Sequence, residues 1–333
     1  MILSIDIGGA NTKITEMDDN YYKIHHIYFP MWKKSNELKE LLKKYHSERV
    51  EKIGVVMTAE LSDAYLDKKE GVNDILDSVE NAFPDKKIYL FDVNGNFITV
   101  DEGRKNYLNV AASNWTVSCS FVSKFIDKNC IFVDMGSTTT DIIPIKDGKI
   151  MGEKTDLDRL MNNQLLYIGA LRTPLSFLSN VIKFRGKNTN ISSEYFSITG
   201  DINLILDKIN ESDYTCDTPD GNLSDKYHSL VRLSKVLCAD LNLVSENELL
   251  NVAEQFYNKI LENIEKNIIS ISKRYNLNNV IIAGLGENIL KDALKNYNIY
   301  SISENYGKEV SISMPSYALG RLMMEELYCN NKH

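Results

Sequence analysis

The chain has 333 residues, of which 43% are hydrophobic and 25% are charged. These values are ordinary for a globular protein, and the length favours two domains or two lobes over a single core. The formal net charge of −8 argues against a nucleic-acid-binding protein, because such proteins usually present a basic surface. The first residues lack a signal-peptide pattern, and no apolar run approaches the ~20 residues of a membrane span, so we expect a cytoplasmic chain.

Cysteine and histidine do not form a recognisable metal or redox motif in this sequence. The adjacent His25 and His26 would point to opposite faces of a strand, which makes them a poor metal pair. The cysteines are spaced too widely for a zinc knuckle or a redox motif, so we expect reduced, mostly structural thiols. They are Cys119, Cys130, Cys216, Cys238 and Cys329.

The first third of the sequence predicts a β-meander followed by alternating helices and strands. Strands are expected at residues 1–7, 12–17 and 21–29, with a break at Gly8-Gly9. Apolar periodicity predicts helices at 36–46, 72–83 and 107–115 and strands at 53–57 and 88–91. Residues 117–126 fit either type of element.

The opening pattern then recurs. A strand at 130–133 ends at Asp134-Met135-Gly136, and a second strand follows at 139–145. Two copies of one unit predict a duplicated architecture. The segment 151–240 is mixed, and the remaining elements are a capped helix at 245–274, a strand at 280–283 and a C-terminal helix at 316–328.

The run from Asp6 to Lys13, here called the first turn, is a candidate phosphate and metal site. A carboxylate at the end of a buried strand can hold Mg²⁺, and glycines let backbone N–H groups approach phosphate oxygens. Lys13 adds a positive charge. The alternative is a tight hairpin whose Asp only caps the turn. The phosphate-binding candidates are Gly8, Gly9, Asn11 and Thr12.

The run from Asp134 to Asp141, here called the second turn, repeats this pattern with hydroxyl side chains after the glycine. Alone it could be a Thr-rich strand, because Thr favours strands. Two Asp-x-Gly turns after buried strands, with a late Gly-x-Gly at Gly284 and Gly286, together favour phosphate handling. The candidates here are Gly136, Ser137, Thr138 and Thr139.

Other candidates lie at strand ends and in loops. Thr58 and Glu60 follow a buried strand, where α/β proteins usually bind ligands, and Glu60 is a candidate base. Arg172 could clamp a phosphate, although loop arginines are often only surface residues. Asp220 could bind a metal or a hydroxyl, but an ordinary Asp-Gly turn explains it slightly better. Gly284 and Gly286 could pack against an adenine or a substitute ligand, and the alternative is that they only mark a helix start.

In motif order, the two Asp-x-Gly turns and the Gly-x-Gly resemble the sugar kinase/heat-shock-70/actin superfamily, in its hydantoinase-A-like branch. This resemblance implies an α/β fold of two duplicated ribonuclease-H-like lobes with a cleft between them. We expect the first lobe at 1–127, with the helix at 316–328 packed back on it. The second lobe is expected at 128–330 and includes the insertion at 151–240.

A narrower resemblance runs from residue 1 to about 290. The first turn, Thr58 to Asp63, the second turn and Arg172-Thr173-Pro174 are similar to an archaeal family once labelled as tetrahydromethanopterin-linked one-carbon-pathway proteins. That family is assigned to methanofuran biosynthesis in methanogens. The resemblance implies a transferase that joins an aminomethylfuran carrying a diphosphate to the phenol of γ-glutamyltyramine, with release of diphosphate.

The candidate residues make chemical sense of that reaction. Mg²⁺ near Asp6 and Asp134, with Lys13 and the donors of both turns, would neutralise the charge of departing diphosphate. A phenol has an unperturbed pKa near ~10, so a base would help. Glu60 is the first candidate base and Asp141 the second.

Two other classes of function stay open at this point. One is an ATP-dependent kinase or hydantoinase-A-like hydrolase, which the Gly284-Leu285-Gly286 run favours. The other is a non-enzymatic nucleotide switch of the actin or heat-shock-70 kind. In the favoured interpretation ATP can bind but is not required, and the partners are small-molecule substrates rather than nucleic acid or membrane. The sequence leaves the metal preference, the acceptor specificity and the oligomeric state undetermined.

Overall fold

The computed structural model describes the backbone of residues 1–329 and the side chains of residues 1–326. Its first sheet has the strand order β3-β2-β1-β4-β5-β6. β1 pairs antiparallel with β2 and parallel with β4, so the predicted meander becomes one edge of a mixed sheet. The strands are β1 (Ile2–Ile7), β2 (Asn11–Met17), β3 (Tyr22–Tyr28), β4 (Lys52–Met57), β5 (Lys87–Phe91) and β6 (Phe97–Ile98).

The second sheet has the order β10-β8-β7-β13-β14, and β9 pairs with β8. β13 pairs in parallel with both β7 and β14. Its strands are β7 (Cys130–Met135), β8 (Thr140–Lys146), β9 (Lys149–Ile150), β10 (Leu165–Leu166), β13 (Asn279–Ala283) and β14 (Asn298–Ser301). A separate ribbon pairs β11 (Val181–Phe184) with β12 (Lys187–Asn190).

The two sheets follow one plan. In each, a strand that ends at an Asp-x-Gly turn is followed at once by its neighbour in the sheet, and two later strands then add in parallel on the other side. The duplicated α/β architecture predicted from the sequence is therefore confirmed. Each turn follows the carboxyl end of a central strand, where α/β proteins place their ligands.

The contacts within the chain divide it into two compact units. The first unit contains residues 1–129, 143–162 and the described residues from 306 onward. The predicted division of the chain into two lobes after residue 127 stays a prediction. The helices of the first unit are α1 (Met31–Lys34), α2 (Leu38–Lys43), α3 (Lys68–Ala82), α4 (Val100–Lys105), α5 (Tyr107–Val110), α6 (Asn114–Phe125), α7 (Asp156–Met161), α14 (Lys308–Ile312) and α15 (Met314–Cys329), with a 3₁₀ turn at Ser35–Glu37.

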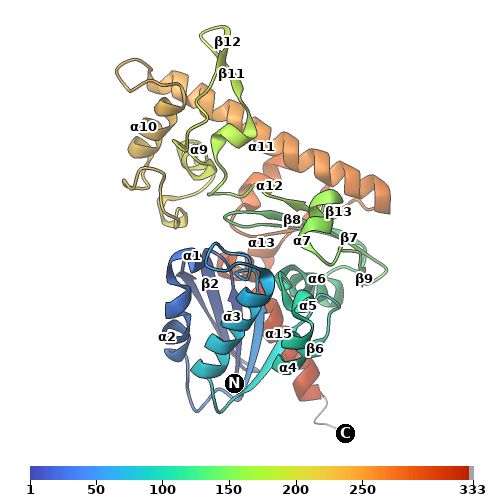
Figure 1. Ribbon diagram of the computed structural model, residues 1–333. Coiled ribbons are helices and arrows are strands. Elements are labelled where there is room, and N and C mark those ends of the chain that lie inside the picture. Colours follow the sequence, from blue (N-terminus) through green and yellow to red (C-terminus); the bar gives the residue numbers. More distant parts are fainter. Residues whose placement is uncertain (330–333) are drawn as a thin grey trace. The chain divides into compact units, whose positions relative to one another are not determined.

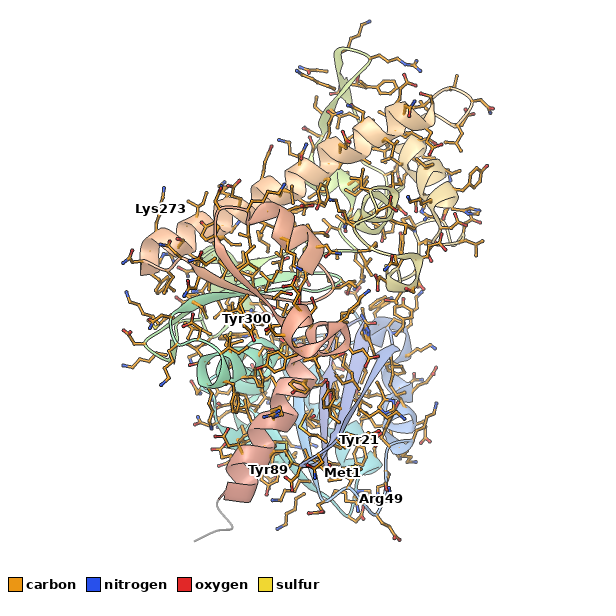
Figure 2. All side chains as sticks on the ribbon, turned by 180° about the vertical axis from the view of Figure 1, so that it is seen from behind. Met1, Tyr21, Arg49, Tyr89, Lys273 and Tyr300 are labelled. Atoms are coloured by element: carbon orange, nitrogen blue, oxygen red, sulfur yellow. The ribbon has the colours of Figure 1, made fainter. Side chains whose placement is uncertain are left out.

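In the first unit, helices cover both faces of the sheet (Figure 1). Alternate side chains of β1, such as Leu3 and Ile5, share a core with α2 and α3. On the other face, Ser4 Oγ donates a hydrogen bond to the Ser316 carbonyl of α15 at 2.7 Å. Met1 and Arg49 lie together at one end of this sheet (Figure 2), and the first turn follows the opposite end of β1.

The second unit contains residues 130–142 and 163–305. The predicted long helix is confirmed as α11, which begins with a capping box between Ser245 and Glu248 and ends at Asn276 in the left-handed conformation. Leu249, Phe256 and Ile260 of α11 share a core with β7 and β13. The helices are α8 (Leu175–Leu178), α9 (Thr199–Ile205), α10 (Lys226–Val236), α11 (Glu246–Tyr275), α12 (Glu287–Ala293) and α13 (Ile302–Tyr306), with a 3₁₀ turn at Glu211–Asp213.

One element prediction is wrong. The single helix expected at 107–115 breaks after Val110, and a new helix, α6, begins at Asn114. The backbone of Ala112 has a positive φ of 51°, which no helix interior allows. Apolar periodicity continues across this break, so it could not reveal it.

Two further features of the described residues are the state of their cysteines and the apolar character of their helices. Cys119 and Cys130 are buried, Cys216 is half-buried and Cys238 is exposed, and these four thiols are free; the Cys329 side chain lies outside the described part. A membrane-crossing helix is absent from the described residues, because none of their helices combines the necessary length with sufficient apolar character.

Candidate functional site

The predicted site residues fall into two groups, one in each compact unit. In the first unit the first turn is closed by the Gly8 N–H, which donates to the Asn11 carbonyl at 2.9 Å. A Cβ at Gly8 would lie 2.7 Å from that carbonyl oxygen, so only glycine fits there. The Thr58 N–H donates to the Ile7 carbonyl at 2.9 Å, which brings the end of β4 beside the turn. A Cβ at Gly9 would meet nothing within 4 Å, so the space above it is open.

Three buried polar atoms of the first turn have no hydrogen-bond partner among the described residues. They are Asp6 Oδ1, Asn11 Oδ1 and Thr12 Oγ1. Buried polar groups are normally paired, so this cluster indicates a place where a ligand supplies the partners. Asp6 is the Cα partner of Lys13 across the β1–β2 pair, and its Oδ2 lies 3.4 Å from Lys13 Nζ. Burial raises the pKa of Asp6, although the Lys13 ammonium and the Asn114 side chain oppose that rise.

Mg²⁺ is the cofactor expected from the sequence, and Asp6 in the first turn is one of its expected ligands. No group of three or more His, Cys, Asp and Glu side chains gathers as a metal site in the described residues. Mg²⁺, however, is usually bound by one or two carboxylates, several waters and substrate phosphates. The unpartnered Asp6 Oδ1 is a free carboxylate oxygen of the kind that such a site uses. The first turn therefore fits Mg²⁺ that enters with a phosphorylated substrate.

Glu60 lies just beyond the end of β4 and is fully buried. Neither of its carboxylate oxygens has a hydrogen-bond partner among the described residues. The nearest cation is Lys68, whose Nζ lies 3.6 Å from Glu60 Oε1. Burial raises the pKa of Glu60 to about 7, against a lowering effect of Lys68. A carboxyl group with that pKa can both accept and release a proton near neutral pH.

The surroundings of Asp6 and Glu60 include residues that the sequence motifs did not indicate. The segment that starts α6 provides the Ala112 backbone near Glu60 and the Asn114 side chain near Asp6. Lys68 begins α3, and Asp156 of α7 lies 3.1 Å from its Nζ. Ala112, Asn114 and Asp156 are far from both motifs in the sequence, and no spacing rule connects them or Lys68 to Glu60. A helix start predicted at Asn114 would have been the one sequence signal that pointed to Ala112 and Asn114.

In the second unit, the second turn repeats the geometry of the first. The Gly136 N–H donates to the Thr139 carbonyl at 2.9 Å, the same distance as in the first turn. A neighbouring segment braces this turn: the Ala170 N–H donates to the Gly136 carbonyl, and the Leu171 and Arg172 N–H groups donate to the Ser137 carbonyl. The loop that contains Arg172 is thereby held against the turn.

Arg172 is half-buried, and its Nη1 donates a hydrogen bond to Thr138 Oγ1 at 3.2 Å. The Ser137 and Thr138 hydroxyl oxygens are 3.5 Å apart. A guanidinium and hydroxyl groups on one glycine turn form a set of donors suited to a phosphate oxygen. Asp141 is half-buried on β8 opposite Leu165 of β10, and its role as an alternative base stays a prediction.

The Gly-x-Gly run packs against the base of the second turn. Gly284 has a φ of +94°, and a Cβ there would lie 2.4 Å from Asp134 Oδ1. The Gly286 N–H donates to the Met135 carbonyl at 2.9 Å. Both glycines therefore have a packing reason to be glycine, and the predicted contact with a nucleotide or substrate stays a prediction. Asp134 itself is half-buried at the end of β7.

Asp220 belongs to a different cluster of the second unit. Its Oδ1 accepts hydrogen bonds from Arg232 Nη1 and from the Asn222 N–H, both at 3.1 Å. Burial alone would raise the pKa of Asp220, but the hydrogen bonds from Asn222 and Arg232 outweigh it and bring the pKa to about 2. These contacts tie the Asp220 turn to the buried Arg232, and its binding role stays a prediction.

Comparison with known proteins shows which family has these motifs. A sequence profile of the hydantoinase/oxoprolinase family matches residues 51–326, and the chain therefore belongs to that family. A curated relative from Methanocaldococcus jannaschii is 62% identical over 327 residues, which cover 98% of each chain. That relative is named (4-{4-[2-(gamma-L-glutamylamino)ethyl]phenoxymethyl}furan-2-yl)methanamine synthase. The narrower resemblance drawn from the motifs is confirmed. The relative's name also supports the transferase interpretation over a kinase, a hydrolase or a nucleotide switch.

Solved structures support the fold alone. A nucleotide-free acetone carboxylase matches 96% of this chain and 70% of its own, with a TM-score of 0.56 and 10% identity. A glucokinase from Streptomyces griseus matches 96% of this chain and 98% of its own, with a TM-score of 0.50 and 10% identity. The predicted α/β fold of the actin, heat-shock-70 and sugar-kinase superfamily is thereby confirmed.

Proposed function

We propose that the chain makes the phenoxymethylfuran ether for which its relative from Methanocaldococcus jannaschii is named. The observation that carries the proposal is 62% identity over 98% of both chains. In the proposed reaction, one substrate is a furan that carries an aminomethyl group and, separately, a methyl group bonded to diphosphate. It reacts with the phenol of γ-glutamyltyramine. The same proposal includes a cytoplasmic place in methanofuran biosynthesis and small-molecule partners.

The proposed step forms one bond and breaks one. The phenol oxygen attacks the furfuryl carbon, the carbon–oxygen bond to diphosphate breaks, and the phenol proton passes to a protein base. Glu60 is the proposed base, because its buried oxygens lack hydrogen-bond partners among the described residues and a phenol O–H would supply one. Its pKa of about 7 suits a base that works near neutral pH.

Departure of diphosphate requires neutralisation of its charge. In the first unit Lys13 supplies a positive charge, and the backbone N–H groups around the open Gly9 supply donors. In the second unit Arg172 and the Ser137 and Thr138 hydroxyls form a separate set of donors suited to phosphate oxygens. Asp6 would hold Mg²⁺, which when bound would offset the charge of the diphosphate oxygens.

The test is a diphosphate-release assay with the furan diphosphate and γ-glutamyltyramine, with mass spectrometry of the ether. We expect product only when both substrates are present, and we expect no requirement for ATP. ATP consumption without the furan diphosphate would instead support a kinase or hydrolase. Release of diphosphate without ether would reject the transferase proposal.

The base is tested by substitution. Glu60→Gln should lower kcat by about 10²–10⁴-fold, because it removes the proton acceptor, and should leave binding of the furan diphosphate largely unchanged. Glu37→Gln is the matched control, since Glu37 is an exposed glutamate of the same unit. Normal turnover by Glu60→Gln combined with loss of turnover in Asp141→Asn would transfer the role to Asp141.

A further inference from the structure

Glu60 stands at one end of a row of alternating charges within the first unit. Lys68 Nζ lies 3.6 Å from Glu60 Oε1 and 3.1 Å from Asp156 Oδ2. Arg159 Nη2 lies 2.6 Å from Asp156 Oδ1, and the Arg159 guanidinium sits over the Trp115 ring at 5.0 Å. Lys68 is therefore shared between two carboxylates, and its hydrogen bond goes to Asp156 rather than to Glu60.

The fold holds Lys68 in this shared position. Lys68 is the first residue of α3, whose N-cap Asp67 accepts a hydrogen bond from the Glu70 N–H at 2.8 Å. One turn later Gly71 packs on the Glu60 backbone so closely that a Cβ would lie 2.1 Å from the Glu60 carbonyl oxygen. The start of α3 is thus pressed against the Glu60 backbone, which fixes the distance between the two side chains.

Asp156 is held from the opposite side. It is the first residue of α7, and the Thr155 hydroxyl caps that helix by accepting the Asp158 N–H at 3.1 Å. Its partner Arg159 is almost completely buried, so the pair cannot rearrange freely. A buried Arg without a carboxylate partner costs stability. Arg159 therefore keeps Asp156 ionised, and the Asp156 carboxylate attracts Lys68.

We propose that Lys68 is a positioning residue for Glu60, and that Asp156 and Arg159, by holding Lys68 between the two carboxylates, set how readily Glu60 accepts and releases a proton. The proposal rests on the base role proposed above for Glu60. A closed Lys68–Glu60 ion pair would fix Glu60 as an unreactive carboxylate. Without Lys68, burial would keep Glu60 protonated and unable to accept a proton.

The electrostatic influences on Glu60 agree with this geometry. Burial raises the pKa of Glu60, Lys68 from α3 lowers it, and Asp156 from α7 raises it. These two side chains are the charged groups that act on Glu60 from the elements packed around it. Because they act in opposite directions, their removal should move the titration of Glu60 in opposite directions.

The experiment is an infrared titration of the carboxyl band of Glu60 in the full chain without substrates, with Glu60→Gln to assign the band. Lys68→Met should raise the midpoint by about one pH unit or more, and Asp156→Asn should lower it by about one. Lys69→Met is the matched control, because Lys69 is the next residue of α3 and is exposed. Lys68→Arg keeps the charge and should keep most of the original midpoint.

Opposite shifts support the proposal, and equal shifts or unchanged midpoints in both variants overturn it. Should Lys68→Met not fold, the direction seen in Asp156→Asn decides the matter alone. The acidic limb of kcat/KM against pH is measured in the same variants. If the infrared midpoints move and this limb does not, Glu60 is not the base, and the positioning role stands without the catalytic one. If both move together, both proposals are supported.

Discussion

Two buried carboxylates, one in each unit, are treated in opposite ways by the fold. Asp201 on α9 and Glu60 after β4 are both 0% exposed. Asp201 Oδ1 accepts hydrogen bonds from Arg232 Nε at 2.8 Å and from the Tyr214 hydroxyl at 2.9 Å. Its Oδ2 accepts from the Ser197 hydroxyl and the Ile198 N–H. Glu60 has none of these partners among the described residues.

The difference is that Asp201 has a full set of hydrogen-bond donors and the Glu60 oxygens have none among the described residues. A buried charge with a full set of donors and a buried Arg is consistent with a role in holding loops together. A buried carboxyl group without hydrogen-bond partners costs stability. Such groups are concentrated at sites where a ligand completes the hydrogen bonds. This contrast, and not burial alone, singles out Glu60.

The largest expected effect is on the Asp201 side of the comparison. Asp201→Ala should lower the free energy of unfolding by about 3–5 kcal/mol, because Arg232 stays buried and loses its main counter-charge. Urea denaturation measures this. Lys226→Ala, which breaks the exposed pair with Asp207, is the control and should cost less than about 0.5 kcal/mol. A cost for Asp201→Ala as small as the control would show that the cluster is not structural.

On the other side, Glu60→Gln should stabilise the protein at alkaline pH. The folded pKa of Glu60 is raised from 4.5 to about 7, so its contribution to stability is complete below pH 4.5 and is lost as pH rises to about 7. This rise in pKa corresponds to about 3 kcal/mol of unfolding free energy. The protein with Glu60 loses that amount as the pH rises, and the Glu60→Gln variant does not. Thermal or urea unfolding at pH 8 and at pH 4.5 checks this. Equal effects at the two pH values would contradict the raised pKa of the buried Glu60.

The two glycine turns, one in each unit, allow a second comparison with smaller expected effects on stability. Gly8→Ala should destabilise the protein by about 2 kcal/mol, because its Cβ would lie 2.7 Å from the Asn11 carbonyl oxygen. At Gly136 the nearest atom to such a Cβ is the Thr139 carbonyl oxygen at 3.7 Å, so Gly136→Ala should cost less than about 1 kcal/mol. Urea midpoints of the two variants test the order, and the reverse order would show that the turns differ from their described geometry.

A moderate effect is expected from the loss of one hydrogen-bond donor of the Asp201 cluster. Tyr214→Phe removes a hydroxyl that donates to Asp201 at 2.9 Å and should cost about 1.5 kcal/mol. Burial raises the pKa of Tyr214, so the hydroxyl stays protonated and the cost should not vary between pH 6 and pH 9. A cost that varies with pH in this interval would mean that the donor is ionising.

The sequence allowed the framework to be predicted but not the surroundings of Glu60. The two Asp-x-Gly turns, the strands before them and α11 were predictable because their signals are local: a buried strand, a glycine and a capping box. Lys68 and Asp156 were not, because only the packing of α3 brings Lys68 to Glu60 and only the packing of α7 brings Asp156 to Lys68. The break before Asn114 was missed because periodicity does not register a single positive φ at Ala112. The metal and phosphate roles of both turns stay predictions.

The contact between β1 and α15 has a consequence for how this protein is made. Ser4 in the first strand bonds to Ser316, and a Cβ at Gly320 would lie 2.9 Å from Ser4 Oγ. During translation the first strand leaves the ribosome while its covering helix is still unmade, for roughly half a minute at about 10 residues per second. Throughout that time one face of β1 lacks its cover, so a nascent chain arrested before residue 316 should need chaperone protection.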